Sequence, residues 1–180
     1  MTIKIFGGKK IQIRKLSKND LRNVKKFQDF INVLIGENAQ IRANRKLSLK
    51  QEKYFMESNL RKIKNQRMVS LLAEYNNKIV GATGINLSEG REGHVGNLGT
   101  MIRQGYRGIG LGKCLMSEIL KLAKKELKPK PKIIRLSVFP TNKPAIALYK
   151  KFGFRKVARI PEQIQYKGKL IDEIIMILEL

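Results

Sequence analysis

Three glycines at alternate positions are the feature that most constrains how this chain folds. Gly108, Gly110 and Gly112 lie between a segment with strand character, His94–Ile102, and an apolar helical run, Cys114–Leu127. A tight glycine loop between a strand and a helix leaves backbone N–H groups without partners, and the helix dipole adds partial positive charge there. The arrangement is typical of a phosphate-binding loop. An ordinary glycine-rich turn is the alternative.

Spacing excludes two familiar loops of this kind. A Walker A loop requires Gly, four residues and then Gly-Lys-Ser/Thr, but Arg107 holds the first glycine position and Cys114 the Ser/Thr position. The dinucleotide pattern Gly-x-Gly-x-x-Gly fails because Lys113 stands where the third glycine is required. What remains is Arg-x-x-Gly-x-Gly over 107–112.

A second motif lies downstream. Leu136–Phe154 contains an apolar strand-like run, the pattern Asn-x-x-Ala-x-x-Leu-Tyr from Asn142 to Tyr149, and a closing Gly-Phe. With the glycine loop, this segment resembles the GNAT superfamily of N-acetyltransferases over 78–154. The resemblance implies an α+β fold of layered helices and sheet. Its central sheet is mixed, mostly antiparallel, of about seven strands, with flanking helices and splayed central strands. It also implies direct transfer of an acetyl group from acetyl-CoA to a primary amine in a ternary complex. The acceptor stays open: the N-terminus of a peptide or protein, a lysine side chain or a small-molecule amine.

The resemblance further implies which residues hold acetyl-CoA. The pyrophosphate is expected on the loop, formed by Arg107, Gly108, Ile109, Gly110, Leu111, Gly112 and Lys113. The pantetheine arm is expected along the backbone of Met101 and Ile102, on a strand that carries a bulge. A backbone N–H there would also stabilise the thioester oxygen as negative charge develops. Asn142 is expected to bind the arm or the local backbone, with a helix cap as the alternative.

Tyr149 is the expected general acid, because the resemblance places there the tyrosine that protonates the coenzyme A thiolate. A phenol with a pKa of about 10 can protonate a thiolate with little loss of driving force. Packing in the core is the alternative role. The general base stays open: family members that acetylate ribosomal-protein N-termini often carry a glutamate where this chain has Ser137. His94, the one histidine, is a candidate base by its ordinary pKa. The alternatives are a surface histidine without a catalytic role, a base acting through water, or no base beyond deprotonation of the substrate.

The charge balance favours anionic partners. The 38 Lys and Arg residues against 14 Asp and Glu residues give a net charge of +24. Such a field suits coenzyme A, a ribosome or nucleic acid, while a solvated basic surface is the alternative. A second function therefore stays open, a ribosome- or nucleic-acid-associated binding protein on the same fold with weak or no catalysis. The single cysteine excludes an internal disulfide and a cysteine-based zinc site, and no metal is expected.

The chain is expected to form a single domain over 1–180. No apolar run is long enough to span a membrane and no signal-peptide pattern begins the chain, so a cytoplasmic protein without a membrane partner is expected. The acceptor site is expected between 36–64 and 161–169, and the last strands could support a homodimer. The expected elements are a hairpin (3–6 and 10–14), helices over 21–36 and from Ser48, strands over 68–74, 78–85, 94–102 and 133–139, the helix 114–127, a short helix over 144–152, and strands over 156–160 and 170–180.

Overall fold

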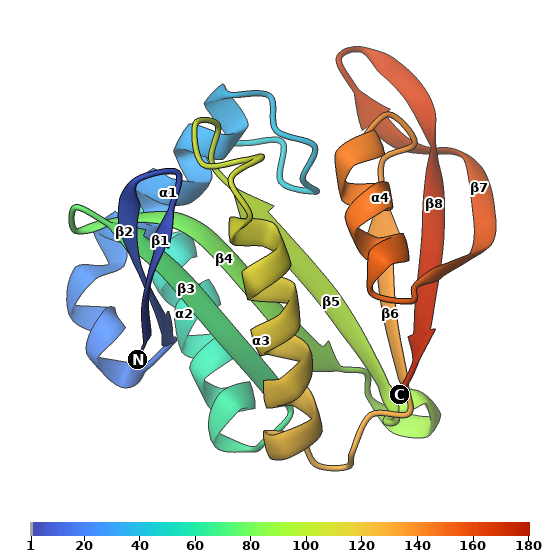
Figure 1. Cartoon of the computed structure of the whole chain (residues 1–180), viewed down its shortest axis with the longest axis horizontal. Helices are drawn as coiled ribbons and strands as arrows, with labels where there is room; N and C mark the ends of the chain where they lie inside the picture. Colours follow the sequence, from blue (N-terminus) through green and yellow to red (C-terminus); the bar gives the residue numbers. More distant parts are fainter. Residues whose placement is uncertain (1) are drawn as a thin grey trace.

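The computed structural model describes residues 2–180, which form one open sheet of eight strands with helices on both faces (Figure 1). The strand order is β1-β2-β3-β4-β5-β6-β8-β7, and every neighbouring pair is antiparallel except β5 and β6. The predicted fold class is confirmed, with eight strands where the resemblance implies about seven. The elements are β1 (Thr2–Phe6), β2 (Lys9–Lys15), η1 (Lys18–Asn23), α1 (Val24–Gly36), α2 (Leu49–Lys64), β3 (Met68–Tyr75), β4 (Lys78–Leu87), η2 (Gly90–Glu92), β5 (Val95–Ile102), α3 (Leu111–Glu126), β6 (Ile133–Val138), α4 (Lys143–Lys151), β7 (Arg155–Tyr166) and β8 (Lys169–Glu179).

The two faces of the sheet carry separate apolar clusters, because successive strand residues point to opposite faces. The helices α3 and α4 cover one face, where they pack with strand residues that include Leu98, Leu136 and Val138. The helices α1 and α2 cover the other face, where Leu72 and Met101 belong to the second cluster. Figure 1 shows α3 in front of the sheet and α1 and α2 behind it. We refer to these as the α3 face and the α1–α2 face.

β5 and β6 separate after a short stretch of pairing. Only Val95–Asn97 and Ile133–Arg135 are paired, whereas β5 continues to Ile102 and β6 to Val138. Figure 1 shows the two strands close together near the C-terminus and diverging toward the loop that precedes α3. The predicted splay is confirmed. Within the described chain it leaves one edge of β5, from Leu98 onward, without a strand partner.

The bulge that the resemblance implies for the strand before the glycine loop is absent from β5, so that expectation is wrong. β5 pairs with β4 in uninterrupted register, from Gly96 opposite Leu87 to Ile102 opposite Gly81. The irregularity lies one strand away, where the β3–β4 register shifts after Ala73. β5 separates from β6 because its pairing on that side ends, while continuous pairing with β4 holds it in the sheet.

The helix after the glycine loop begins earlier than the sequence predicts. α3 starts at Leu111, three residues before the predicted start at Cys114. Gly110 takes a left-handed conformation with φ 91° and forms the N-cap, so the loop ends there. Gly112 and Lys113 therefore belong to the first helical turn, whose N–H groups lack intrahelical acceptors.

The first strand of the final hairpin is longer than predicted. β7 continues through Pro161 to Tyr166 instead of ending at Ile160. Proline is tolerated on an edge strand at a bulge, and the β7–β8 register shifts between Ile160 and Ile164. The proline therefore marks a bulge within one strand rather than the end of it.

Local signals elsewhere are confirmed. Ser48 caps α2 reciprocally with Gln51: the Gln51 N–H donates to the Ser48 hydroxyl at 3.3 Å, and the Ser48 N–H donates to the Gln51 side chain at 2.8 Å. Asn76 and Asn77 both take positive φ in the β3–β4 turn. No helix within 2–180 is both long and apolar enough to cross a bilayer.

Candidate active site

The loop between β5 and α3 presents a row of unpaired backbone N–H groups. The Tyr106 N–H donates to the Arg103 carbonyl, and the next backbone bond is from the Cys114 N–H to the Gly110 carbonyl at 3.1 Å. Between them, the N–H groups of 107–113 have no hydrogen-bond acceptor in the part of the chain that the structure describes. These donors lie at the N-terminus of α3, where the helix dipole is positive. The loop therefore fits an anionic ligand such as a pyrophosphate.

The Arg107 side chain folds back onto the protein instead of extending from the loop. Its Nε donates to the carbonyl oxygen of Ile102 at 2.7 Å, and its terminal nitrogen lies 3.3 Å from a carboxylate oxygen of Glu37. The same carboxylate oxygen accepts a hydrogen bond of 2.9 Å from the Gln104 N–H. Arg107 thus fixes the shape of the loop, whereas Lys113 is exposed on the first turn of α3.

Glu37 is a site residue that the sequence interpretation missed. It follows Gly36, which ends α1, and the sequence predicts only that a loop begins there. Its side chain is 16% exposed and lies within 4.0 Å of the Arg103 guanidinium as well as near Arg107. The sequence offers one local signal for Glu37: it is an acidic residue directly after a predicted helix, in a chain with few acidic residues. The carboxylate anchors the glycine loop to the end of α1.

The free edge of β5 offers the backbone groups of Thr100 and the N–H of Ile102, whose carbonyl oxygen already accepts the bond from Arg107. The Arg103 N–H donates to the Val80 carbonyl of β4 at 3.0 Å. Because backbone groups of alternate strand residues point to opposite sides, those of Met101 also face β4, while those of Thr100 and Ile102 face the gap beside β6. The sequence interpretation pairs the pantetheine arm with Met101 and Ile102. In the β4–β5 register, Ile102 lies at the free edge, the backbone groups of Met101 face β4, and Thr100 is the next residue whose backbone groups face the gap.

Tyr149 lies on α4, on the α3 face of the sheet. It is 8% exposed, and its ring centroid is 5.8 Å from that of Phe154. Burial raises the pKa of Tyr149 above its ordinary value of 10.0, so the phenol stays protonated at neutral pH. Its hydroxyl has no hydrogen-bond partner among residues 2–180. Tyr149 is therefore a core residue whose hydroxyl is not engaged by another described residue.

Asn142 caps α4, and Gly112 brings α4 close to the loop. The Asn142 side-chain oxygen accepts a hydrogen bond of 3.3 Å from the Ala145 N–H, so the helix-cap role is present. A Cβ on Gly112 would meet Leu148 at 3.3 Å and Ile102 at 3.4 Å. The absence of a side chain at Gly112 thus allows α3, α4 and the end of β5 to meet at one point.

The loop between α1 and α2, residues 37–48, spans from the glycine loop to the far half of the sheet (Figure 1). At one end Glu37 contacts the glycine loop. Farther along, the Asn38 carbonyl accepts a hydrogen bond of 2.8 Å from the Tyr166 hydroxyl of β7. The Arg42 guanidinium donates to the Ser137 hydroxyl of β6 at 3.0 Å and pairs with Glu173 of β8. We call this segment the 37–48 loop; it connects the two halves of the sheet on the α1–α2 face.

Comparison with protein families identifies this architecture. Residues 38–154 match the family model described as the acetyltransferase (GNAT) family. The chain belongs to the GNAT family. The match contains the glycine loop, the free edge of β5, Asn142 and Tyr149, which are the parts assembled around the gap between β5 and β6.

Individual relatives of this GNAT protein are more distant. An L-amino acid N-acetyltransferase, AaaT, of Escherichia coli is 28% identical over 103 residues, 57% of this chain and 62% of that protein. An N-alpha-acetyltransferase of Sulfolobus acidocaldarius is 39% identical over 67 residues, 37% of this chain and 38% of that protein. The chain thus matches less than two thirds of either relative. A GNAT acetyltransferase structure from Streptococcus pneumoniae superposes with a TM-score of 0.81 at 23% identity, over 94% of this chain and 99% of that one, and shows the shared fold.

His94 lies away from the elements gathered around the gap in this GNAT fold. It is exposed and directly precedes β5, whereas the glycine loop follows the other end of that strand. Eight strand residues separate the two ends by roughly 25 Å. The backbone carbonyl of His94 accepts a hydrogen bond of 2.9 Å from the Lys132 N–H, which joins β5 to the start of β6. His94 thus lies at the end where β5 and β6 are still paired, which suits a structural role.

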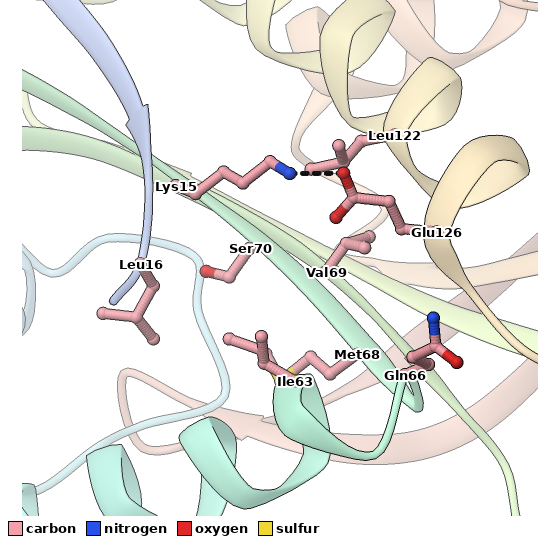
Figure 2. A pocket seen from close by; sticks show the side chains of 9 residues that line it. All are labelled: Lys15, Leu16, Ile63, Gln66, Met68, Val69, Ser70, Leu122 and Glu126. Atoms are coloured by element: carbon pink, nitrogen blue, oxygen red, sulfur yellow. Dashed lines mark hydrogen bonds and ion pairs between the residues drawn. The ribbon is translucent and has the colours of Figure 1, made fainter. Parts of the chain in front are cut away.

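A cavity of about 220 Å³ lies at the opposite end of α3 from the glycine loop. Figure 2 shows Lys15 and Glu126 paired across it, with Ile63, Met68 and Leu122 among its walls. Glu126 is the last residue of the 16-residue α3, so the cavity is roughly 20 Å from the loop along the helix. It is separate from the GNAT site. Among residues 2–180, no group of three or more His, Cys, Asp or Glu side chains is arranged to hold a metal ion.

Proposed function

We propose that this protein transfers the acetyl group of acetyl-CoA directly to an α-amine, either of a free amino acid or of a peptide N-terminus. The observation that carries the proposal is a set of unpaired backbone groups on two neighbouring parts of the chain. They are the N–H groups of 107–113 in the loop and, on the free edge of β5, the Ile102 N–H and the backbone groups of Thr100. A pyrophosphate would accept hydrogen bonds from the loop N–H groups, and an attached arm that contains amides would pair with the free edge of β5.

In the proposed reaction, the donor and the acceptor approach the gap between β5 and β6 from opposite faces of the sheet. The pyrophosphate binds at the N-terminus of α3, and the pantetheine arm enters the gap between β5 and β6 from the α3 face. The acceptor amine attacks the acetyl carbon, the new N–C bond forms and the C–S bond breaks. Tyr149, a phenol that is protonated at neutral pH, gives its proton to the departing thiolate. The N–H groups at the β5 edge stabilise the negative charge on the carbonyl oxygen.

The names of the two curated relatives support an α-amine acceptor. One acts on L-amino acids and the other is an N-alpha-acetyltransferase. The 37–48 loop and the β7–β8 hairpin border the α1–α2 face of the gap, where the acceptor would enter opposite the donor. The 14 acidic residues of the chain make a pocket for a polycationic acceptor a poorer match.

The test has a donor step and an acceptor step. Calorimetry with acetyl-CoA should show one binding site per chain, and absence of binding would refute the proposal. Release of free coenzyme A thiol is then measured with L-amino acids, peptides with free N-termini, the same peptides with blocked N-termini and a free lysine side chain, and polyamines. Free α-amines should give the highest turnover. Salt-dependent binding of ribosomal RNA without acetyl-CoA binding would instead favour the binding-protein alternative that the charge of +24 suggests.

A further inference from the structure

Glu173 is a buried carboxylate whose one ion-pair partner in the described chain is an exposed arginine. It lies on β8 and is 3% exposed. One of its carboxylate oxygens accepts a short hydrogen bond from Arg42, whose side chain is 74% exposed. A carboxylate removed from water requires a cation or strong hydrogen bonds in compensation. Here that cation comes from a surface side chain on the 37–48 loop.

The other buried carboxylates in an ion pair are held differently. Asp20 and Glu74 both accept hydrogen bonds from Arg14, whose side chain is only 21% exposed. Lys26, 19% exposed, adds a second cation to Glu74 at 2.8 Å. Those partners are themselves enclosed in the fold. Arg42 is mostly in water, so it loses little when it separates from Glu173, provided that another cation takes its place.

The strand register places Glu173 on the acceptor side of the gap. Ser137 of β6 lies opposite Ile175 of β8, so both point to the same face, and Glu173, two residues from Ile175, points there too. Leu136 and Val138, the neighbours of Ser137, belong to the α3-face cluster. Ser137 and Glu173 therefore face the α1–α2 side, opposite Tyr149. Ser137 also follows the last paired residues of β5 and β6, where the two strands have separated.

We propose that Glu173 binds the ammonium group of the acceptor and takes its proton, and that Arg42 is a cover that the ammonium displaces. The proposal rests on the function proposed above. The Arg42 guanidinium contacts both Ser137, 3.0 Å from its hydroxyl, and Glu173. The Glu173 carboxylate thus lies next to Ser137, the position at which some family members carry a glutamate. In this chain the carboxylate comes from the neighbouring strand, β8.

The protons balance in two steps. One N–H bond of the acceptor ammonium breaks, and the proton passes to the Glu173 carboxylate and then to water. The neutral amine forms the N–C bond, and the C–S bond to coenzyme A breaks. The nitrogen then loses its second proton to solvent, which restores the proton that Tyr149 gave to the thiolate. The net products are the amide, the free thiol and one proton.

Glu173→Gln keeps the shape of the side chain and its capacity to hydrogen-bond. The probe is the acceptor with the highest turnover in the panel above. The variant should lower kcat/KM for that acceptor by about 100-fold, with the acetyl-CoA dissociation constant within about twofold of wild type. The matched control is Asp172→Asn, because Asp172 is the adjacent residue of β8 and pairs with Arg159 instead of Arg42. It should leave kcat/KM unchanged. A Glu173→Gln variant with wild-type kcat/KM would overturn the proposal.

Arg42→Gln distinguishes a catalytic role of Glu173 from a purely structural ion pair between Arg42 and Glu173. If Arg42 covers Glu173, its removal eliminates a competing cation, and kcat/KM should rise about two- to fivefold through a lower KM for the acceptor. If the pair only holds the 37–48 loop in place, both variants should lower kcat/KM together, which would overturn the proposal. Arg42→Gln leaves the buried Glu173 carboxylate without its ion-pair partner, so urea unfolding of the variant is measured beside its kinetics. Absence of acetyl-CoA binding by the wild type would refute the proposed function itself, independently of Glu173.

Discussion

Arg107 donates a hydrogen bond of 2.7 Å from its Nε to the carbonyl oxygen of Ile102, the last residue of β5. This bond ties the loop with free N–H groups to the strand edge that continues the site. Glu37 adds a second tie to the same guanidinium at 3.3 Å. Because the guanidinium is already engaged, we expect Arg107 to contribute to donor binding mainly through loop shape, and exposed Lys113 to contribute through its charge.

Arg107→Gln should therefore weaken acetyl-CoA binding about tenfold, or ~1.4 kcal/mol, at both low and high salt. Lys113→Gln should weaken binding about two- to threefold at low salt and hardly at high salt, because salt screens an exposed charge. Calorimetry of both variants at the two salt concentrations measures the difference. If the loss in Arg107→Gln disappears at high salt, the guanidinium acts on the ligand by charge, and the loop-shape account is wrong.

Tyr149→Phe removes the proposed acid and keeps the ring that packs near Phe154. We expect kcat to fall about 100-fold, with the acetyl-CoA dissociation constant and the melting temperature close to wild type. Tyr75→Phe is the control, because Tyr75 is half-buried and its ring lies against Tyr106, away from α4. A Tyr149→Phe enzyme with wild-type kcat would exclude the general-acid role.

The pH profile tests the same residue without a mutation. Burial raises the pKa of Tyr149 above 10.0, so the phenol keeps its proton at higher pH than an exposed tyrosine does. The activity of the wild type should therefore show no alkaline decline due to Tyr149 until the pH exceeds about 10. A measured decline with a midpoint well below 10 that Tyr149→Phe abolishes would contradict the raised pKa.

The sequence predicts the parts of this site that are local. Asn142, the end of α1 at Gly36 and the glycine loop each depend on residues a few positions apart. The sequence does not predict the pair of Arg42 and Glu173, which are 131 positions apart and meet only through the folded sheet. The sequence also does not predict that the backbone groups of Thr100, and not those of Met101, face the gap, because the pairing of β5 with β4 decides which residues do so.

Gly110→Ala tests the backbone conformation that begins α3. Gly110 has φ 91°, a region that disfavours any residue with a Cβ, so the variant should lose ~1–2 kcal/mol of unfolding free energy and bind acetyl-CoA more weakly. Gly36→Ala is the control: a Cβ there meets no atom within 4 Å, and its φ is not in the left-handed region. It should gain ~0.5–1 kcal/mol. Equal effects in the two variants would show that the left-handed conformation is not what makes Gly110 necessary. Urea unfolding and calorimetry measure both quantities.

The acid stability of the protein should depend on the network of Arg14, Lys26, Asp20 and Glu74. Burial opposes the charged forms of both carboxylates, but hydrogen bonds from Arg14, and from Lys26 to Glu74, outweigh it and lower the pKa of each below its ordinary value. Groups with lowered folded pKa values stabilise the protein above their unfolded pKa values, near 3.8 and 4.5, and this stabilisation is lost as the pH falls through the folded values.

Glu74→Gln should therefore lower the unfolding free energy by about 3 kcal/mol at neutral pH, because Arg14 and Lys26 lose a buried partner. When the pH falls from above to below about 4, Glu74→Gln should also lose less unfolding free energy than the wild type does. Glu118→Gln is the control, since Glu118 pairs with Lys4 on the surface, and it should change stability by less than about 1 kcal/mol. Urea unfolding across this pH range measures both effects. If wild type and Glu74→Gln lose equal free energy on acidification, Glu74 does not contribute to the acid sensitivity.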